Sequence, residues 1–214
     1  MFEKIENEKD AYYLGILLSD GCASISKNKS KSVHLELNKE DSKTVYDFKS
    51  YLGVSNNIQK KEKTVAISIG GARLFDNLQK YSCVPRKSLI LEFPKNINPN
   101  LYCHLIRGYF DGDGCISKIL FNRKSRSKTS QEYFQRSKWQ VDFSGTFDFL
   151  SEIQKIINVN GVLYKVNKNN DKNTFRLIYT HNIKVKKVLE FMYSSATVYM
   201  DRKYNKFQEF YYNN

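Results

Sequence analysis

Two separate stretches of the chain combine a dense apolar pattern with an Asp-Gly ending. Residues 11–21 have the sequence AYYLGILLSDG, and residues 105–114 have the sequence LIRGYFDGDG. The apolar residues are too closely spaced for a helix with one buried face, so we expect two helices that are buried on most sides. Each also carries two small residues four positions apart, which lie on one helix face and allow close backbone approach. The pattern therefore predicts that the two helices pack against each other.

The segments that follow these motif helices alternate apolar and polar residues with the period of half-buried strands, most clearly at residues 32–38 and 138–144. The predicted elements of the first half are strands at 22–27 and 32–38, a helix at 41–52, a hairpin of 57–61 and 64–69, and a helix at 72–81. Those of the second half are strands at 115–122 and 138–144, a helix at 147–158, a hairpin of 162–167 and 174–180, and helices at 182–192 and 204–212.

Counting each motif helix first, the order αββαββα occurs in each half. We therefore expect an α+β fold of two pseudo-symmetric repeats, residues 1–97 and 98–214. Strands with one apolar and one polar face form sheets that helices cover on one side only. Two such antiparallel sheets would form a saddle with a long polar face, and the two motif helices would lie at the interface between the repeats.

The Asp-Gly endings carry the candidate chemistry. Asp20 and Asp113 lie in the last turns of the two motif helices, where the helix dipole disfavours a negative charge. A bound cation would relieve that cost, and Mg²⁺ is usually held by one or two carboxylates together with substrate phosphates. Asp-Gly after one helix could be no more than a turn, but two copies in equivalent places favour a shared site. Gly21 and Gly114 are expected to adopt the left-handed conformation that is common after a helix.

The first motif stretch resembles the LAGLIDADG motif of homing endonucleases. Leu14-Gly15 keeps the glycine of that motif, and Asp20-Gly21 keeps its acidic ending. Leu18 departs from the motif, because Asp is common at this position. The family does not use that position to bind metal, so the departure is expected to affect packing more than chemistry.

The second motif stretch is closer to the family pattern. Residues 106–114, IRGYFDGDG, keep both Asp111 and Asp113. The resemblance extends over almost the whole chain. It implies a monomeric, sequence-specific endonuclease that cuts both strands of a long double-stranded DNA site and serves intron or intein mobility. It also implies that cleavage is a metal-dependent phosphodiester hydrolysis that leaves 3′ overhangs.

The same resemblance implies a metal site and its cofactor. The metal-site residues would be Asp20 and Asp113 together with the residues before them, Ser19 and Gly112. Two carboxylates can hold the divalent ions that activate water and stabilise charge in phosphodiester hydrolysis. We expect Mg²⁺ as the cofactor, Mn²⁺ as a substitute, and Ca²⁺ to support DNA binding without cutting.

Lys87 and Lys203 occupy matching places near the ends of the two repeats. Family members carry a basic residue in that part of each repeat, so the resemblance makes both lysines candidate catalytic residues. Each would stabilise transition-state charge or assist the attacking water. The alternative is that they are two solvated lysines in connecting segments.

A strong basic surplus points to the partner. The chain of 214 residues has 35 Lys+Arg against 22 Asp+Glu, a formal net charge of +13. Such a charge suits a polyanion, here double-stranded DNA, although an inert basic surface or a ribosomal or membrane-surface protein is the alternative. Residues 123–138 are predicted to be a basic loop that grips phosphates, or else a solvated loop. The predicted DNA contacts are Ser24, Ser26, Lys27, Lys29, Lys31, His34, Glu36, Asn38, Gln59 and Lys61 in the first repeat and Lys118, Asn122, Arg123, Lys124, Arg126, Lys128, Gln140, Asp142, Ser144 and Arg176 in the second.

Neither a signal peptide nor a membrane span is visible in the sequence. We therefore expect no membrane partner and an intracellular location, in the cytoplasm of a bacterium or phage host or in an organelle with an AT-rich genome. The four cysteines form no CxxC pair, which argues against a zinc site or a disulfide framework. Cys22 and Cys115 each follow a motif glycine and are predicted to be small buried residues.

Two other function classes remain open. The first is a non-cleaving LAGLIDADG protein that acts as an RNA maturase or a DNA-binding regulator, but the presence of both motif carboxylates favours the endonuclease. The second is a carboxylate-dyad hydrolase such as a glycosidase. The net charge of +13 and the absence of an aromatic cluster near the Asp-Gly pairs argue against it. The sequence shows no Walker-type loop, Ser-His-Asp order or HExxH motif.

Overall fold

The computed structural model describes residues 1–124, 133–166 and 173–212. The first repeat consists of α1 (Glu8–Ser19), β1 (Gly21–Ile25), β2 (Lys31–Asn38), η1 (Lys39–Asp41), α2 (Ser42–Leu52), β3 (Ile58–Lys60), β4 (Thr64–Gly70), α3 (Ala72–Gln79) and η2 (Lys87–Leu89). The second consists of η3 (Pro99–Leu101), α4 (Tyr102–Asp113), β5 (Gly114–Lys124), β6 (Tyr133–Gly145), α5 (Phe147–Ile157), β7 (Val162–Lys165), β8 (Phe175–Tyr179), α6 (Asn182–Tyr193) and α7 (Asp201–Tyr212). The predicted order αββαββα is confirmed in both halves, and α7 follows the second. The boundary at residue 97 stays a prediction.

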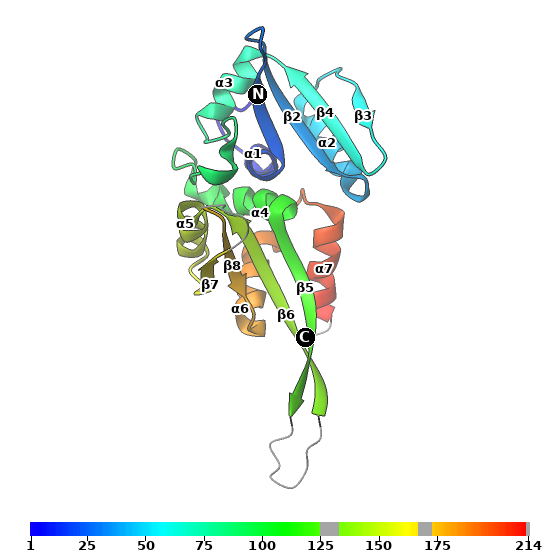
Figure 1. The fold of residues 1–214 in the computed structure, drawn as a ribbon, viewed down its shortest axis with the longest axis vertical. Helices are drawn as coiled ribbons and strands as arrows, with labels where there is room; N and C mark the ends of the chain where they lie inside the picture. Colours follow the sequence, from blue (N-terminus) through cyan, green and yellow to red (C-terminus); the bar gives the residue numbers. More distant parts are fainter. Residues whose placement is uncertain (125–132, 167–172, 213–214) are drawn as a thin grey trace.

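Each repeat forms its own four-stranded antiparallel sheet. The strand orders are β1-β2-β4-β3 and β5-β6-β8-β7, so the two sheets have the same topology. Figure 1 shows α1 and α4 side by side at the centre of the molecule, with one sheet extending away on each side. The fold is therefore α+β and pseudo-symmetric, with the motif helices at the repeat interface, as predicted.

The contact between α1 and α4 depends on two glycines. A Cβ atom on Gly15 would lie 2.6 Å from the backbone nitrogen of Tyr109, and one on Gly108 would overlap the carbonyl oxygen of Tyr12. Real side chains cannot approach backbone atoms this closely, so only glycine permits the observed helix separation. The predicted use of small residues for close packing is confirmed at these positions.

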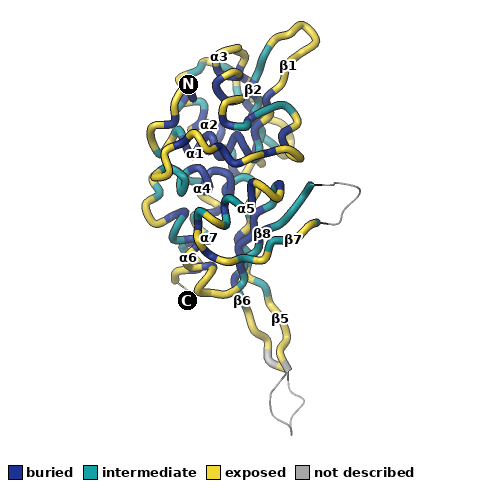
Figure 2. The backbone as a smooth tube through the Cα atoms, turned by 90° about the vertical axis from the view of Figure 1, so that its left-hand side faces the viewer, coloured by how far each residue is buried: buried dark blue, intermediate teal, exposed yellow. Residues whose placement is uncertain are grey.

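The apolar face of each sheet packs against helices. In β2, Val33 and Leu35 are buried, and in β6 the same pattern buries Trp139, Val141 and Phe143. Figure 2 shows the buried backbone concentrated around α1, α4 and the inner parts of the strands. The predicted alternation is therefore confirmed for β2 and β6. In the described parts of the chain, no helix is both long and apolar enough to span a membrane.

The predicted left-handed conformation of the motif glycines is wrong. Gly114 has φ −91° and ψ 168°, and the described glycines with positive φ are Gly53 and Gly71. The chain passes directly from each motif helix into a strand, without a left-handed turn. Glycine is needed for space instead, because a Cβ on Gly21 would lie 2.7 Å from the Cα atom of Leu17.

The predicted basic loop at residues 123–138 is also different in the structure. β5 continues to Lys124 and β6 begins at Tyr133, and these two residues are paired across the ribbon. Figure 1 shows this two-stranded ribbon projecting beyond the rest of the second repeat. Aromatic residues between the basic ones favour strand structure, and the basic count alone did not reveal this. Arg126 and Lys128 lie outside the described residues.

Replacement of either interface glycine should be costly. Gly15→Ala or Gly108→Ala would force the two helix backbones apart, with an expected loss of about 1–3 kcal/mol in the free energy of unfolding. Gly70→Ala is the matched control, because a Cβ there meets no atom within 4 Å. Urea unfolding of the three variants measures the difference. Equal stability of all three would show that the helices can separate freely.

Candidate active site

The helix contact brings the two motif carboxylates together. Asp20 caps the C-terminus of α1, and Asp113 is the last residue of α4. A Cβ on Gly112 would overlap the carboxylate of Asp20 and would lie 2.7 Å from the Cβ of Ser19. The side chain of Asp20 therefore lies against the end of α4, one residue before Asp113. The sequence positions of these two residues are 93 apart, but the crossing of α1 and α4 places them at one site.

Both carboxylates are electrostatically strained. Partial desolvation and the negative charge of Asp20 raise the pKa of Asp113 to about 6. Burial raises the pKa of Asp20, although a hydrogen bond from Ser19 and the positive charges of Lys87 and Lys203 oppose the shift. Neither carboxylate forms an ion pair with a cation in the part of the chain that the structure describes. The site therefore has an excess of negative charge that a bound cation would relieve.

The donor set fits a hard divalent cation. No cluster of three or more His, Cys, Asp or Glu side chains that could hold a metal occurs among the described residues. A structural zinc site needs four such ligands, whereas Mg²⁺ is commonly held by one or two carboxylates with water and phosphate as the other ligands. Asp20 and Asp113 provide the two carboxylates. Ser19 and Gly112 line the same place, and the carbonyl oxygen of Ser19 accepts a hydrogen bond from Lys87 Nζ at 3.3 Å.

The two candidate lysines lie at equivalent buried positions. Lys87 in η2 is 7 % exposed and Lys203 in α7 is 2 % exposed, so the alternative of two solvated lysines is wrong. Lys87 Nζ also donates to the carbonyl oxygen of Gly21. Lys203 Nζ donates to the carbonyl oxygen of Gly114 and to that of Phe110 at 3.4 Å. Each ammonium group thus satisfies carbonyl oxygens at the end of its own motif helix, where the dipole favours a cation.

Sequence reasoning missed the role of a fully buried carboxylate beside the candidate site. Asp111 is buried and accepts hydrogen bonds from the hydroxyls of Tyr12 at 2.8 Å and Tyr193 at 2.5 Å and from the backbone N–H of Met200 at 2.8 Å. Burial raises its pKa, and these hydrogen bonds act in the opposite direction. Asp111 therefore fixes the end of α4 against α1 and against the segment before α7. The signal available in the sequence was the position of Asp111, a charged residue inside an otherwise apolar helix.

A buried arginine in α4 extends the same network. Arg107 donates to Glu8 of α1 at 2.6 Å, to the carbonyl oxygen of Met192 at 2.8 Å and to that of Val198 at 3.0 Å. A fully buried guanidinium must have its donors satisfied, and this one is satisfied by both repeats. Arg107 thus connects the first repeat to the chain between α6 and α7.

Arg202 connects the repeats a second time, at the edge of the candidate site. Its guanidinium donates to both carboxylate oxygens of the buried Asp41, at 3.1 and 2.8 Å. Both residues line a cavity of about 340 Å³ that also contains Asp20 and Lys63. Sequence reasoning did not select Arg202 or Lys63. The position of Arg202 directly before Lys203 was the only signal for the former.

The predicted DNA contacts of the first repeat mostly lie on the free sheet face. Strand register places Ser24 and His34 on the face opposite the buried Val33, and Asn38 follows the same alternation. Lys31 lies on the helical side instead, where it pairs with Asp76 at 2.5 Å. The prediction that Lys31 lies on the DNA-facing side of the sheet is therefore wrong, because its side chain pairs with Asp76 on the opposite side.

Glu36 is already engaged on the free face. Its carboxylate accepts hydrogen bonds from Lys61 at 2.7 Å, Thr64 at 2.5 Å and His34 at 3.2 Å. These hydrogen bonds lower the pKa of Glu36 to about 2. Glu36 thus positions Lys61 and His34 as much as it presents its own oxygens.

The predicted face of Lys118 and Asn122 in the second repeat is wrong. Lys118 is paired with the buried Trp139, and its Nζ lies 5.7 Å from the indole centroid. Alternation along β5 places both residues on the same side as the buried Ile116. The error arose because Ile116 was not recognised as the inward residue, and a shift of one position reverses every side chain.

Gln140, Asp142, Ser144 and Arg176, the predicted contacts on β6 and β8, lie on the free face, and one of them is buried. Gln140 and Ser144 alternate with the inward residues of β6. Asp142 is only 2 % exposed, and its carboxylate binds the guanidinium of Arg176. Tyr164, which sequence reasoning did not select, is paired with Arg176 on the same face. Asp142 therefore holds Arg176 in place.

The prediction that Cys22 and Cys115 are buried is wrong. Both are exposed, because each is the second residue of its strand and points to the free face.

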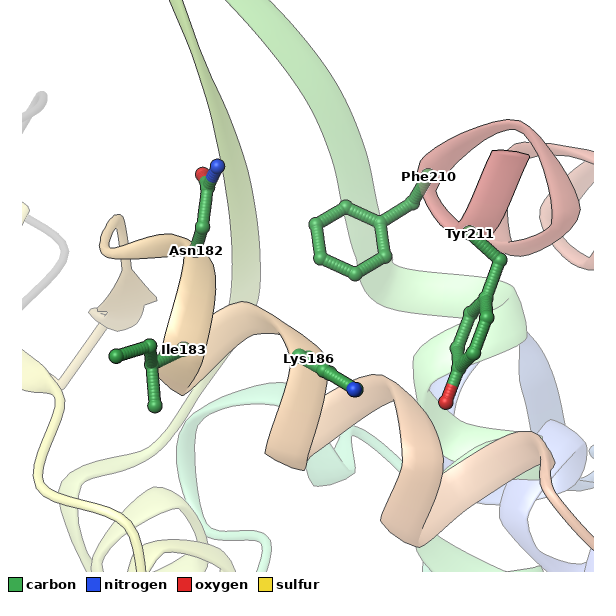
Figure 3. Close-up of a pocket in the computed structure, with 5 residues that line it drawn as sticks. All are labelled: Asn182, Ile183, Lys186, Phe210 and Tyr211. Atoms are coloured by element: carbon green, nitrogen blue, oxygen red, sulfur yellow. The ribbon is translucent and has the colours of Figure 1, made fainter. Parts of the chain in front are cut away.

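A pocket between α6 and α7, lined by Ile183, Lys186 and Tyr211 among others, is shown in Figure 3. It contains none of the predicted site residues.

The strained carboxylates give a prediction for the metal-free protein. The folded state raises the pKa of Asp113 from 3.8 to about 6. Between these pH values the folded state binds more protons than the unfolded state, so this group makes the free energy of unfolding fall as pH rises. Asp113→Asn removes that effect and should raise Tm near neutral pH in EDTA, but not below pH 3.8, and the rise should be small because Asp113 is exposed to solvent screening.

Glu62→Gln at an exposed turn position is the control, and it should leave Tm unchanged at both pH values. Thermal unfolding followed by circular dichroism measures the difference. A lower Tm for Asp113→Asn near neutral pH would show that the Asp113 carboxylate is stabilised by the fold.

Comparisons with known proteins agree with this geometry. A model of the LAGLIDADG endonuclease family matches residues 106–213. No curated protein sequence matches the chain. Among solved structures, the I-SmaMI LAGLIDADG homing endonuclease bound to cleaved DNA is 13 % identical, with 98 % of this chain and 89 % of that chain covered and a TM-score of 0.67.

Two further solved structures match this chain over a similar share of its length. The LAGLIDADG meganuclease I-AabMI bound to uncleaved DNA is 16 % identical, with coverage of 97 % and 90 % and a TM-score of 0.66. I-SmaMI bound to an uncleaved DNA target in the presence of calcium ions is 14 % identical, with coverage of 97 % and 90 % and a TM-score of 0.66. At these identities the structural matches establish the fold. Since the family model spans half of the chain, this protein belongs to the LAGLIDADG endonuclease family.

Proposed function

We propose that this protein is a homing endonuclease that cuts both strands of a specific double-stranded DNA site by Mg²⁺-dependent phosphodiester hydrolysis and leaves 3′ overhangs. The observation that carries the proposal is the meeting of Asp20 and Asp113, one from each repeat, between two sheets with free polar faces. The structurally similar protein I-SmaMI has been solved bound to cleaved DNA and, in the presence of calcium ions, bound to an uncleaved DNA target. These descriptions of I-SmaMI support the same chemistry here.

Asp20 and Asp113 would hold the divalent ions, and Ser19 and Gly112 would line their site. A bound Mg²⁺ supplies a low-pKa water nucleophile and neutralises charge on the phosphate and the leaving oxygen. The two carboxylates, which repel each other and have raised pKa values, would both be stabilised by a bound cation. Each repeat contributes one carboxylate, so one chain carries everything that a two-strand cut needs. This supports a monomer whose functional units are residues 1–97 and 98–214.

Lys87 and Lys203 would act from the ends of the motif helices. Their ammonium groups hold the backbone that carries Asp20 and Asp113, and their positive charge opposes the rise in the pKa of both carboxylates. Positive charge fixed beside a reacting phosphate stabilises the charge that develops in the transition state. Each lysine is therefore proposed to position its carboxylate and to favour the transition state.

The free faces of the two sheets would bind the DNA. A two-stranded ribbon fits the major groove, where side chains can distinguish all four base pairs. The net charge of +13 favours a nucleic acid as the partner. The free-face residues proposed to contact DNA are Ser24, Ser26, His34, Asn38, Gln59 and Lys61 in the first repeat and Gln140, Ser144 and Arg176 in the second, with Lys27 and Lys29 in the turn between β1 and β2.

Loss of either motif carboxylate should abolish cutting and spare binding. Asp20→Asn and Asp113→Asn each remove a metal ligand but keep the shape of the side chain. Asp148→Asn is the matched control, because it makes the same change at an exposed carboxylate in the first turn of α5, outside the site. Supercoiled DNA carrying a site selected from a randomised duplex library is incubated with Mg²⁺, and DNA binding is measured by gel shift in Ca²⁺.

The control variant is expected to keep cutting. Double-strand cutting by Asp20→Asn or Asp113→Asn would refute the assignment of the site. A wild-type protein that binds DNA tightly and never cuts it would instead be a DNA-binding regulator, and preferential binding of structured RNA would indicate a maturase.

Substitution of a candidate lysine should slow the chemical step. Lys203→Met removes a buried cation beside the site, and loss of one group that stabilises transition-state charge costs roughly 10²–10³ in rate. Lys206→Met is the matched control, because Lys206 lies one turn further along α7 and its Nζ donates to the carbonyl oxygen of Ile116 at 2.9 Å. Single-turnover cutting rates in Mg²⁺ and binding constants in Ca²⁺ are compared for the two variants.

Both variants lose a hydrogen bond to a β5 carbonyl, so a similar loss of stability is expected from both. Only Lys203→Met should lose rate, with an unchanged binding constant. Equal rates for the two variants would remove Lys203 from the catalytic group.

A further inference from the structure

Each repeat carries an Arg-Lys pair at the same point of the chain, but the two arginines have different surroundings. Arg86 precedes Lys87, and Arg202 precedes Lys203. Arg202 donates from Nε and Nη2 to the two carboxylate oxygens of Asp41, at 3.1 and 2.8 Å, where α7 begins beside the first repeat (Figure 1). Arg86 is exposed, and its side chain forms no ion pair with any residue that the structure describes. The pseudo-symmetry of the site therefore ends at the residue before each lysine.

The partner of Arg202 is also unlike its counterpart in the other repeat. Asp41 and Thr146 are the N-cap residues of α2 and α5. The hydroxyl of Thr146 accepts a hydrogen bond from the N–H of Phe149 at 3.3 Å and donates to the carbonyl oxygen of Leu91 at 2.5 Å. The side chain of Asp41 makes no such cap hydrogen bond and binds Arg202 instead. The first repeat thus has a buried carboxylate where the second has a neutral side chain.

The salt bridge holds Arg202 from one side only. The side chain of Asp41 is 4 % exposed, whereas that of Arg202 is 43 % exposed and lines the cavity of about 340 Å³ that contains Asp20. The third guanidinium nitrogen, Nη1, has no hydrogen-bond partner in the described part of the chain. The negative charge of Asp41 contributes to the raised pKa of Asp20, so the pair lies within electrostatic reach of the candidate metal ligand. Arg202 is therefore fixed beside Asp20 with donors available to a ligand.

The other charged groups that line this cavity leave an excess of positive charge next to Asp20. Three of the four carboxylates are already engaged by Lys, Arg or Tyr side chains, namely Glu36, Asp41 and Asp111. Lys63 is exposed and forms no ion pair with a described residue, and its carbonyl oxygen is held by the N–H of Lys39 at 3.0 Å. The charges that remain are one carboxylate, which suits a metal ion, and two cations, which suit a phosphate group.

We propose that Arg202, held by Asp41, contacts the phosphate that is cut beside Asp20, and that the two DNA strands are therefore cut at unequal rates. This inference rests on the proposed function. An arginine that is already fixed loses little conformational entropy when it binds a phosphate. The strand that is cut beside Asp113 has no such group, because no carboxylate holds Arg86. Arg202 would be a catalytic residue and Asp41 a positioning residue.

The contribution of Arg202 to the reaction is electrostatic. In hydrolysis the oxygen of a water molecule bonds to phosphorus, one P–O ester bond breaks, and a proton from the water ends on the departing oxygen. Negative charge on the phosphate oxygens grows in the transition state, and a guanidinium that is already in place stabilises it. The strand that is cut beside Asp20 should therefore be cut first.

The test measures the cutting of each strand separately. The variants are Arg202→Gln, Asp41→Asn and the two combined, which leaves no buried carboxylate unpaired. Arg86→Gln is the matched control at the equivalent position of the first repeat. The probe is a duplex recovered by wild-type protein from a randomised library in Ca²⁺, with a different fluorescent label on each strand. Single-turnover rates are measured in Mg²⁺ with protein in excess, so that differences in affinity do not enter, and circular dichroism checks the fold of each variant.

The wild-type protein should cut one strand first, and the nicked duplex should accumulate transiently. Arg202→Gln should slow the cut of that strand by roughly 10²–10³-fold and leave the rate for the other strand unchanged. Asp41→Asn should slow the same strand to a smaller extent, because Arg202 remains but is no longer held. The combined variant should behave as Arg202→Gln does. Arg86→Gln should change neither rate.

A purely structural role would give a different result. Loss of the connection between the repeats would slow both cuts alike, and that outcome would overturn the inference. Equal rates for the two strands in the wild-type protein, or unchanged rates in Arg202→Gln, would also overturn it. Each of these results includes cutting, and each therefore leaves the proposed endonuclease intact.

Ethylation interference in Ca²⁺ maps the phosphate contacts independently of cutting. Ethylation of one phosphate should weaken binding by the wild-type protein and have no effect on binding by Arg202→Gln. The same interference pattern for both proteins would reject the contact. A wild-type protein that shows this difference and never cuts in Mg²⁺ would support the contact and reject the endonuclease.

Discussion

The structure depends on the direct backbone contact between α1 and α4. Gly15 and Gly108 let the helices approach until no side chain fits between them. That distance puts the helix ends, and therefore Asp20 and Asp113, at one place. A wider separation would leave two isolated carboxylates, each unfavourable at the negative end of its own helix dipole. The chemistry of the site is thus a consequence of how closely two helices can pack.

Buried charges fix the direction of this contact, since a glycine contact alone does not specify one. Asp111 and Arg107 project from α4 into the interface, and their hydrogen bonds reach Glu8 and Tyr12 of the first repeat. Because each buried charge must be fully paired, any rotation of α4 would leave several groups unsatisfied. Arg202 and Asp41 add a second connection near the surface. The repeats are therefore held in one relative position by polar groups placed in an otherwise apolar interface.

The sequence was sufficient for the repeated fold and for the carboxylate pair, because both follow from strong periodic patterns and from Gly at 15 and 108. The sequence was insufficient where tertiary packing determines which face a residue occupies or which partner it contacts. The pairing register of β5 with β6 places Lys118 on the inner face, and no local sequence pattern fixes this register at the end of a strand. Glycine is needed at position 114 because Phe110 leaves no room for a Cβ atom, which only the folded chain reveals. The pairing of Arg202 with Asp41 joins residues from different repeats, and charge patterns along the chain do not encode such partners.

The covalent joining of two unequal halves frees each sheet to evolve separately. Two of the polar connections between the halves, Arg107 with Glu8 and Arg202 with Asp41, lie on or beside helices and not on the free faces of the sheets. Substitutions on one recognition surface can therefore accumulate without a matching change on the other. The long β5–β6 ribbon is an instance of such divergence, because its first-repeat counterpart remains short. Under the proposed function, two unlike sheets would meet two unlike halves of a DNA site, so the target need not be palindromic.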